Sequence, residues 1–385
     1  MGTIMNLRKV LVTGGAGFIG SHLVSKLSGS GHSIRIMDNL SPQIHGAVPT
    51  NLEWLLHSSI EFYRGSVTRR EDWIRALNGV DGVVHLAAET GTGQSMYEIA
   101  RYNRVNSQGT ALLFDVLSSL KRKTLKRVIL ASSRSVYGEG AYVHFDDDSE
   151  RIYPSARNAA QLAKHQWEHT CSRTGKPLKA AATKESDRVR PCSVYAVTKA
   201  SQEDLVRVGC EALGIGYFIF RLQNVYGEGQ SINNAYTGIL SIFSTLIRQG
   251  QELPIFEDGK ESRDFVHVND VAEVIKQSLL APKAINGVLN VGSGVGTSVF
   301  DVATILSNAL GAKPNIKITG QYRIGDIRHN FADIEKLCAW MGGTPRISLN
   351  EGIQRLADWV VQQPLPEENL LERANQKLID RKLMG

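Results

Sequence analysis

The stretch KVLVTGGAGFIGSHLVSKL, from Lys9 to Leu27, decides the fold of this chain. It opens with a short apolar, β-branched run that predicts a strand. A glycine-rich turn follows, in which Gly14, Gly17 and Gly20 recur at every third position, and the next residues have the apolar spacing of a helix. Glycine suits this turn because a Cβ would block the approach of the backbone to a pyrophosphate, which the helix N-terminus then faces. Strand, glycine turn and helix together predict a dinucleotide-binding unit.

Strands and helices alternate after this unit. The run Ser33–Met37 predicts a second strand, which leads into Asp38, 24 residues beyond Gly14. An acid at this place binds the adenine ribose hydroxyls, and no arginine follows closely to bind a 2′-phosphate, so the residues favour NAD over NADP. The same reading predicts strands Ile60–Arg64, Gly82–Leu86 and Arg127–Ala131 and the helix Arg69–Leu77. This alternation predicts an α/β fold with a Rossmann-type, doubly wound parallel sheet.

Two polar segments follow strands of this sheet. HLAAET begins at His85, and SSRSVYG begins at Ser132. Ligands of doubly wound sheets bind at the carboxyl ends of the strands, so both segments are candidates for the site. His85 could be a catalyst, but a lone histidine is more often packed or hydrogen-bonded, and we favour that reading.

The stretch PCSVYAVTKASQEDLV, from Pro191 to Val206, supplies candidate chemistry. Apolar residues at helical spacing predict a helix that runs to about Leu213. Tyr195 and Lys199 are four residues apart and therefore lie on one face of it. A phenol with a pKa near ~10 is a poor base at neutral pH, and an adjacent ammonium favours the phenolate. By itself this pair fits an acid/base site or an ordinary exposed helix.

Composition limits the possible classes of protein. The 385 residues are 42% hydrophobic, which is enough for one large or two ordinary domains. A formal net charge of +6 fits an anionic small molecule, and no pattern typical of nucleic-acid binding is present. The basic run KRKTLKR, Lys121 to Arg127, is predicted to close a helix, where its charges complement the helix dipole.

The four cysteines are scattered without a CxxC pair, which favours a reducing, cytoplasmic location. We expect neither a signal peptide nor a membrane span, because no apolar run approaches ~18 residues. His165, His169 and Cys171 are close in sequence, but one cysteine without a second is a poor zinc pattern, so we expect no metal site.

A set of ordered motifs resembles a known family. TGGAGFIG, HLAA, Asn106 in NxxGT, ASSRSVYG, YAVTK, RLQNVYG, RDFVHVNDV and NVGSG are similar to the extended short-chain dehydrogenases/reductases, a family of NAD-dependent nucleotide-sugar epimerases and dehydratases. The resemblance covers roughly Arg8 to Val360. The string HLAAETGTGQSMYEI and a long insertion after Tyr137 are similar to its dTDP-L-rhamnose 4-epimerase-like branch, with UDP-glucose 4-epimerase-like members next.

The resemblance implies a role for each matching residue. Ser133, Tyr195 and Lys199 match the catalytic residues: Tyr195 is the base, and Lys199 binds the nicotinamide ribose and lowers the tyrosine's pKa toward 7. The implied NAD-binding residues, besides Tyr195 and Lys199, are Gly14, Gly17, Phe18, Ile19, Gly20, Asp38, Asn39, Ser66, Val67, Leu86, Ala87, Ala88 and Asn106. The implied nucleotide-sugar ligands are Ser133, Arg134, Asn224, Arg263, Arg323 and Asp326. Arginines suit the diphosphate because their planar donors bind phosphate oxygens bidentately. Without the resemblance, Arg263 and Arg323 would be read as surface residues and Asn224 as a turn cap.

Departures from the family pattern narrow the reaction. Related 4,6-dehydratases carry an Asp–Glu pair after the catalytic Ser/Thr, whereas this chain has Arg134 and Ser135. Without an acid to protonate a leaving hydroxyl, dehydration loses its catalyst. Two reactions remain: epimerisation at C4 through a 4-keto sugar, which we favour, and net dehydrogenation or 4-ketoreduction with exchange of the cofactor. A non-catalytic NAD sensor would have lost Tyr195 or Lys199. Ser66 stands where family members often carry an acid that binds the adenine, so we expect a lower affinity for NAD.

We expect residues 1–220 to form the NAD-binding domain, residues 221–363 to form a substrate domain with parts that return to the first, and residues 364–385 to be a polar tail, either a peripheral helix or disordered. Residues 141–190 are an insertion expected to lie over the substrate cleft. Helices are predicted at Ala235–Gln249, Val268–Leu280 and Ser298–Leu310, and strands at Leu253–Phe256 and Val288–Val291. The resemblance implies a homodimer through the helices Ile99–Leu120 and Val194–Leu213. Asn330 falls where some relatives carry a bulkier residue, which implies a roomier sugar pocket.

Overall fold

The computed structural model describes residues 7–28, 31–46, 52–56, 59–120, 124–232, 234, 236, 238–365 and 370–385. Seven parallel strands form its central sheet, in the order β3-β2-β1-β4-β5-β8-β12. These strands are β1 (Lys9–Thr13), β2 (Ser33–Asp38), β3 (Ile60–Arg64), β4 (Gly82–His85), β5 (Arg127–Ser133), β8 (Gly216–Leu222) and β12 (Gly287–Val291). The direction of strand addition reverses between β1 and β4, so a crevice opens at their carboxyl ends, as in other doubly wound sheets.

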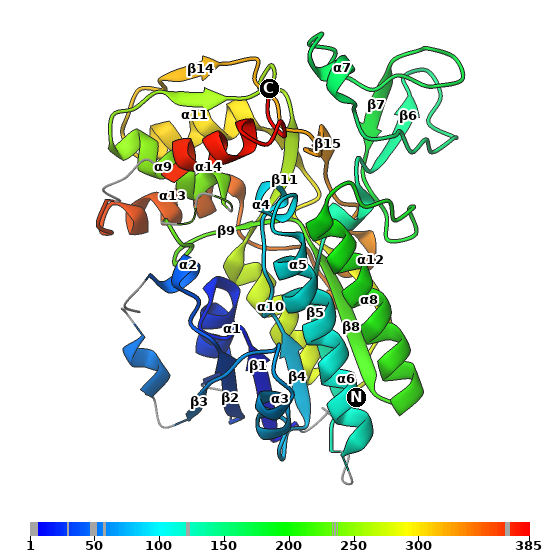
Figure 1. Cartoon of the computed structure of the whole chain (residues 1–385), viewed down its shortest axis with the longest axis vertical. Coiled ribbons are helices and arrows are strands. Elements are labelled where there is room, and N and C mark those ends of the chain that lie inside the picture. Colours follow the sequence, from blue (N-terminus) through cyan, green and yellow to red (C-terminus); the bar gives the residue numbers. More distant parts are fainter. Residues whose placement is uncertain are drawn as a thin grey trace.

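Helices cover both faces of the sheet, and this explains the apolar character of its strands (Figure 1). One face carries α1 (Phe18–Ser28), α10 (Val268–Leu280) and α12 (Glu335–Met341), and the other carries α3 (Arg70–Ala76), α6 (Gly109–Ser119) and α8 (Val194–Leu213). A hydrophobic core lies on each face of the sheet, and alternate residues of a strand pack into one core or the other. Val84 packs on the α1 side, whereas Val83 packs on the α8 side.

Short helices lie between these elements or extend them, most of them near the upper, carboxyl-terminal edge of the sheet (Figure 1). They are α2 (Pro42–His45), η1 (Glu53–Leu56), α4 (Thr92–Ser95), α5 (Ile99–Tyr102), the π-helical segment η2 (Asn103–Gln108) and η3 (Arg134–Tyr137). The segments after β1, β4 and β5 all begin at this edge, and so the sheet places them beside one another.

A second group of elements stands above the sheet. The helices α9 (Ile239–Arg248), α11 (Val299–Ala309) and α13 (Leu349–Val360) share one core. Beside them, β10 (Leu253–Ile255) pairs with β14 (Ile316–Ile318), and β11 (Ser262–His267) pairs with β9 (Asn224–Tyr226), β13 (Gly296–Ser298) and β15 (His329–Asn330). The chain enters this group through β9 and returns to the central sheet at β12.

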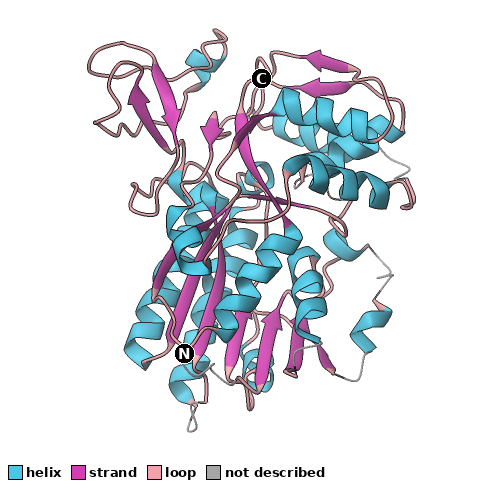
Figure 2. Cartoon of the chain, turned by 180° about the vertical axis from the view of Figure 1, so that it is seen from behind, coloured by secondary structure: helices cyan, strands magenta, loops and turns pink. Residues whose placement is uncertain are grey.

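The insertion forms a separate projection on the opposite side of the upper end (Figures 1 and 2). It contains an antiparallel pair, β6 (Ala141–His144) and β7 (Leu178–Ala181), and the short helix α7 (Ala159–Leu162). The fully buried Arg328 joins it to the second group: its Nε lies 2.9 Å from Glu168 of the insertion and its Nη1 lies 2.9 Å from Glu257. His165, His169 and Cys171 have separate surroundings here, since His165 stacks on Trp167 and His169 contacts Glu139.

Most predicted elements are present. The strand Ile60–Arg64 and the helix Val268–Leu280 have the predicted bounds, and the helix predicted over 298–310 is α11, with Ser298 as its N-cap. The helix predicted over 235–249 is observed as α9 from Ile239, while residues 235 and 237 lie outside the described residues. The C-terminal tail contains α14 (Leu370–Ile379), so the helical alternative was correct for this part.

One prediction was wrong. The basic run was expected to close a helix, but α6 ends at Ser119 and Arg127 begins β5. Residues 121–123 lie outside the described part of the chain. The Arg127 side chain is fully buried, and its guanidinium donates to the carbonyls of Ser278 (2.6 Å) and Ala281 (2.7 Å) at the end of α10. The charge therefore does complement a helix C-terminus, but that of a helix distant in sequence.

Across the described residues, no helix has both the length and the apolar character needed to cross a bilayer.

Candidate active site

The glycine turn between β1 and α1 is closely packed. Gly14 has a φ of +67°, and a Cβ there would lie 2.8 Å from the backbone nitrogen of Ala87. A Cβ on Gly20 would lie 2.6 Å from the carbonyl oxygen of Gly14. Phe18 and Ile19 open α1, so the first turn of that helix directs its free N–H groups to the same edge. The turn keeps the space and the backbone donors that a pyrophosphate needs.

Asp38 ends β2 beside this turn. Its carboxylate accepts hydrogen bonds from the backbone N–H of Ala16 (3.1 Å) and of Leu40 (2.9 Å). These bonds fix a buried carboxylate against the glycine turn, where it can accept hydrogen bonds from ribose hydroxyls. Asn39 follows it and accepts a bond from the N–H of Ser41.

Ser66 and Val67 follow β3 on the same edge. The N–H of Ser66 donates to Asp72 (2.8 Å), and the carbonyl of the buried Val67 accepts from the Trp73 indole (2.8 Å). This segment is therefore held by α3.

Leu86, Ala87 and Ala88 continue from β4 across the turn. The N–H of Leu86 donates to the Thr13 carbonyl (3.1 Å). His85 itself is buried between the hydroxyls of Thr13 (2.8 Å) and Thr110 (3.0 Å), and burial lowers its pKa to about 3. A neutral histidine with both nitrogens engaged is a packing residue, as the sequence favoured.

Asn106 lies in the π-helical segment, a distortion that often marks functional sites. Its side chain accepts from the N–H of Glu89 (2.8 Å) and donates to the hydroxyl of Thr198 (3.0 Å). It is fully buried. Asn106 thus ties the segment after β4 to α8, the helix that carries Tyr195 and Lys199.

The three predicted catalytic residues converge at the top of β5. Ser133 is the last residue of that strand, and its oxygen accepts from the hydroxyl of Ser135 (2.9 Å), which leaves the Ser133 proton free to donate. Tyr195 lies in the first turn of α8, which Ser193 caps by accepting from the N–H of Ala196 (3.2 Å). Lys199 lies one turn later, with its Nζ 6.0 Å from the centre of the Tyr195 ring.

The pKa of Tyr195 departs from the sequence expectation. In the protein itself the pKa of this phenol is raised, because burial disfavours the phenolate. Hydrogen bonding to Ser133 and the charge of Arg134 act in the opposite direction. The chain's own groups therefore do not produce the fall of the Tyr195 pKa toward 7 that the resemblance implies. Arg134 favours the phenolate, which the spacing of Tyr195 and Lys199 did not reveal.

Lys199 is held in place by its surroundings. Its ammonium donates to the carbonyl of Ala131 (2.9 Å) in β5. Burial lowers its pKa to about 7, while the charge of Glu203 on the same helix acts in the opposite direction. A buried ammonium with one protein acceptor has donors left for a ligand.

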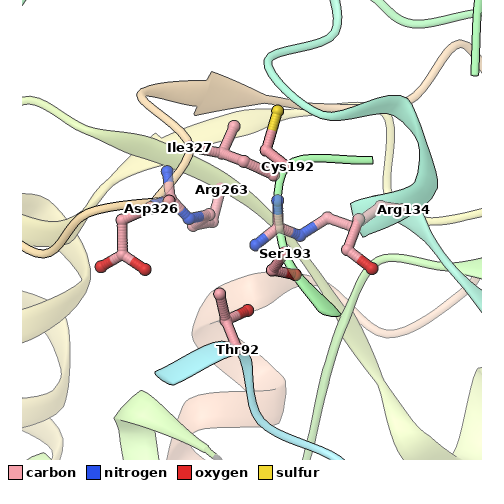
Figure 3. A pocket seen from close by; sticks show the side chains of 9 residues that line it. Thr92, Arg134, Cys192, Ser193, Arg263, Asp326 and Ile327 are labelled. Carbon is pink, nitrogen blue, oxygen red and sulfur yellow. The ribbon is translucent and has the colours of Figure 1, made fainter. Parts of the chain in front are cut away.

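A polar pocket adjoins these residues on the side of the second group of elements (Figure 3). Its lining comprises Thr92, Arg134, Ser135, Cys192, Ser193, Arg263, Gly325, Asp326 and Ile327. Arg134 extends toward Arg263 in Figure 3, and burial and the charge of Arg263 lower the pKa of Arg134 to about 9. The Arg134 Nε donates to Asn224 (2.8 Å), whereas its Nη1 is buried without a hydrogen-bond partner. Two close guanidinium groups and an unpaired donor favour an anionic or oxygen-rich ligand.

The other predicted substrate residues lie around this pocket. Arg263 is fixed by donation from Nη1 to the carbonyls of Ser262 (2.8 Å) and Arg328 (2.9 Å). Asp326 lines the pocket, and its negative charge favours the charged forms of both Arg134 and Arg323. Arg323 itself does not line the pocket: its guanidinium lies 4.6 Å from the ring centre of Phe256.

Sequence reasoning missed several lining residues. Thr92, Ser135 and Ser193 are next to motifs that were recognised, and a search for hydroxyls beside those motifs could have found them. Cys192 and Ile327 carry no such signal, because a small or apolar residue has no characteristic spacing.

The chain resembles known proteins over most of its length. Residues 10–292 match the NAD dependent epimerase/dehydratase family. A dTDP-L-rhamnose 4-epimerase of Burkholderia thailandensis is 39% identical over 363 residues, which are 94% of this chain and 97% of that protein.

Solved structures share the fold. A UDP-N-acetylglucosamine 4-epimerase of Methanobrevibacter ruminantium, in complex with UDP-N-acetylmuramic acid, has a TM-score of 0.74 at 29% identity and covers 94% of this chain and 100% of its own. A UDP-glucuronic acid 4-epimerase of Bacillus cereus, in complex with UDP-glucuronic acid and NAD, has a TM-score of 0.75 at 27% identity and covers 92% of this chain and 99% of its own.

Proposed function

Because this chain belongs to the NAD dependent epimerase/dehydratase family, we propose that it is a nucleotide-sugar 4-epimerase that acts on a dTDP- or UDP-hexose. The observation that carries the proposal is the arrangement at the top of β5. Tyr195 and Lys199 lie on one face of α8 beside Ser133, and the next residue along the chain is Arg134 rather than an acid. Such a site, with NAD bound, can move a proton and a hydride, and neither residue that follows Ser133 is an acid that could expel a hydroxyl.

NAD is the cofactor of this enzyme. The crowded glycine turn, the N-terminus of α1 and the fixed carboxylate of Asp38 suit its pyrophosphate and adenine ribose. NAD supplies a reversible hydride acceptor and a positive charge next to the phenol when it is bound. Lys199 would hold the nicotinamide ribose with its remaining donors.

The protein's own residues handle the proton at the C4 oxygen. Tyr195 as phenolate removes the proton from the C4 hydroxyl and returns it to the oxygen of the 4-keto sugar after the sugar has turned. The Ser133 hydroxyl donates its proton to the phenolate and can turn to donate it to the sugar oxygen once Tyr195 is protonated, and Arg134 stabilises the negative charge on Tyr195. Because the hydrogen taken from C4 is returned to C4, no cofactor is consumed overall.

The polar pocket receives the rest of the substrate. Arg263 in the pocket wall, with Asn224 and Arg323 next to the pocket, would bind the diphosphate, and Arg134 and Asp326 would contact the sugar. In this proposal residues 1–220 bind NAD, residues 221–363 bind the nucleotide sugar, and the insertion 141–190 closes one side. We expect dTDP-linked 6-deoxyhexoses to be better substrates than UDP-hexoses, because the 39% identical relative is named for dTDP-L-rhamnose.

Purified protein with separate dTDP- and UDP-sugars and a catalytic amount of NAD tests the proposal. We expect a C4 epimer by chromatography without accumulation of NADH absorbance. Tyr195→Phe should lower kcat by about 10²–10⁴-fold and leave NAD binding intact, because it removes the general acid/base alone. Tyr217→Phe, which removes a phenol that bonds Glu211 far from the site, is the matched control. NADH that rises in step with a keto product, with turnover that stops when NAD is spent, would instead identify a dehydrogenase.

The active protein is proposed to be a cytoplasmic homodimer. The helices that the resemblance assigned to the interface expose apolar side chains at Ile99 (54% exposed), Val197 (55%) and Val208 (54%). Val197 and Val208 are three helical turns apart and share one face of α8. All four cysteines are free thiols, which suits a reducing compartment.

A further inference from the structure

The C-terminal segment, residues 370–385, returns to the loop that carries Arg323. The N–H of Tyr322 donates to the carbonyl of Gly385 (2.8 Å), and the N–H of Gly385 donates back to Tyr322 (3.0 Å). The N–H of Ile324 donates to Leu383 (3.0 Å), and Met384 between them is buried. The last three residues therefore pair antiparallel with the two neighbours of Arg323. Leu371 at the start of α14 packs against the core that α9, α11 and α13 share, and Figure 1 shows the C-terminus at the upper end of the molecule.

The same segment contacts the Arg323 side chain. The Arg323 Nη2 donates to the side-chain amide oxygen Oδ1 of Asn375 on α14 (2.7 Å), while Phe256 covers one face of the guanidinium. The Arg323 Nε is buried and has no hydrogen-bond partner. Asn375 and Phe256 thus fix the plane of the guanidinium, and one buried donor is left for another acceptor.

The segment also contacts residues in and after α4, next to the pocket. Leu378 lies against Gly93, where a Cβ would be 3.3 Å from its Cδ1, and the Arg381 guanidinium lies 4.6 Å from the ring centre of Tyr97. Gly93 follows Thr92, which lines the pocket. The C-terminal segment therefore connects the α4 side of the site to the loop of Arg323.

We propose that the C-terminal segment orients Arg323 for the diphosphate of the nucleotide, with Asn375 as the positioning residue. The inference rests on the proposed function, since it takes a nucleoside diphosphate as the ligand. An arginine loses side-chain freedom when it binds phosphate, and a guanidinium already held in place loses less. Burial lowers the pKa of Arg323, so its charge lacks solvation and a phosphate oxygen is a favourable partner.

Binding of dTDP, UDP and NAD to Asn375→Ala, measured by calorimetry, tests the proposal. We expect the affinity for the nucleoside diphosphate to fall about tenfold, with NAD affinity and Tm unchanged. Gln376→Ala is the matched control, because Gln376 is the next residue of α14 and its amide bonds only to the exposed Asp380. Deletion of residues 383–385, which removes the pairing around Arg323, should lower the same affinity even if Asn375→Ala does not fold.

The proposal would be overturned if both variants bound dTDP and UDP as tightly as wild type. It would also be overturned if they lost as much affinity for NAD as for the nucleoside diphosphate, because the segment would then matter only for stability. A wild-type protein that binds neither dTDP nor UDP would overturn it as well. Wild-type protein that binds dTDP or UDP but does not epimerise sugars would refute the proposed reaction and leave the role of Asn375 standing.

Discussion

At the scale of single residues, the proposed reaction depends most on Tyr195. Its phenol is buried at the start of α8, and burial raises its pKa above the ordinary value. A base that must ionise near neutral pH therefore needs positive charge close by. Lys199 is held by Ala131 and lies 6.0 Å from the ring centre, whereas Arg134 is the charged side chain that lowers the phenol's pKa in the protein itself.

Arg134→Gln should shift the pH dependence of kcat/KM. Removal of the positive charge disfavours the phenolate, so the pKa of Tyr195 rises and the acid limb of the profile moves to higher pH. Activity at pH 7 should fall about tenfold, and part of it should return as the pH is raised. Arg134→Lys keeps the charge and should keep the position of the limb, although KM rises because the guanidinium contact with Asn224 is lost. The same limb in wild type and Arg134→Gln would refute this role.

At the scale of elements, the glycine turn between β1 and α1 is packed closely against the segment that follows β4. Gly14 and Gly79 have nearly the same φ, +67° and +70°, but a Cβ on Gly14 would meet Ala87 at 2.8 Å, while one on Gly79 would meet nothing within 4 Å. The two positions therefore separate backbone strain from crowding.

Gly14→Ala should weaken NAD binding at least about tenfold, because the new methyl pushes the turn away from the segment after β4. Gly79→Ala should cost about 1 kcal/mol of stability from strain alone and leave NAD affinity unchanged. Fluorescence titration with NADH and chemical unfolding of both variants measure the two effects. An equal loss of NAD affinity in both would contradict the crowding argument.

Much of this architecture could be predicted from local signals. Gly14, Asp38 and the Tyr195–Lys199 pair belong to short motifs, each set by one turn or one helix, so sequence spacing contains the geometry. Arg127 was misread because its partners, the last carbonyls of α10, are about 150 residues away in the chain. The contact between Asn375 and Arg323 was missed for the same reason, since no local pattern predicts where a C-terminal helix docks.

At the scale of the whole molecule, Arg328 joins the insertion to the elements above the sheet. It is fully buried among Glu168, Glu257 and Asp258. Arg328→Leu should lower the free energy of unfolding by about 3–5 kcal/mol, because it breaks the buried ion pair with Glu257, which then has only Arg157 beside it, and removes the guanidinium that Glu168 and Asp258 share. Arg173→Leu, which breaks the exposed pair with Glu150, should change it by less than about 1 kcal/mol. Chemical unfolding of both variants measures the difference, and equal effects would show that the Arg328 cluster is not an anchor.

The proposed dimer makes a second prediction at this scale. Val208→Glu should dissociate it, because a charge would enter an apolar helix face. Val361→Glu is the control, since Val361 is equally exposed at 55% but lies after α13. Light scattering after size exclusion gives the mass of each variant. A monomeric wild-type protein, or a Val208→Glu variant that stays dimeric, would contradict the proposed interface.

In the proposed reaction the hydrogen taken from C4 returns to C4, and Tyr195 moves only the hydroxyl proton. The most direct test uses a nucleotide sugar deuterated at C4, with catalytic NAD, and mass spectrometry of the epimer. We expect the product to keep the deuterium at C4 in ordinary water, without accumulation of NADH. A product that has exchanged its deuterium for solvent hydrogen, or a keto product formed with stoichiometric NADH, would contradict the proposed reaction.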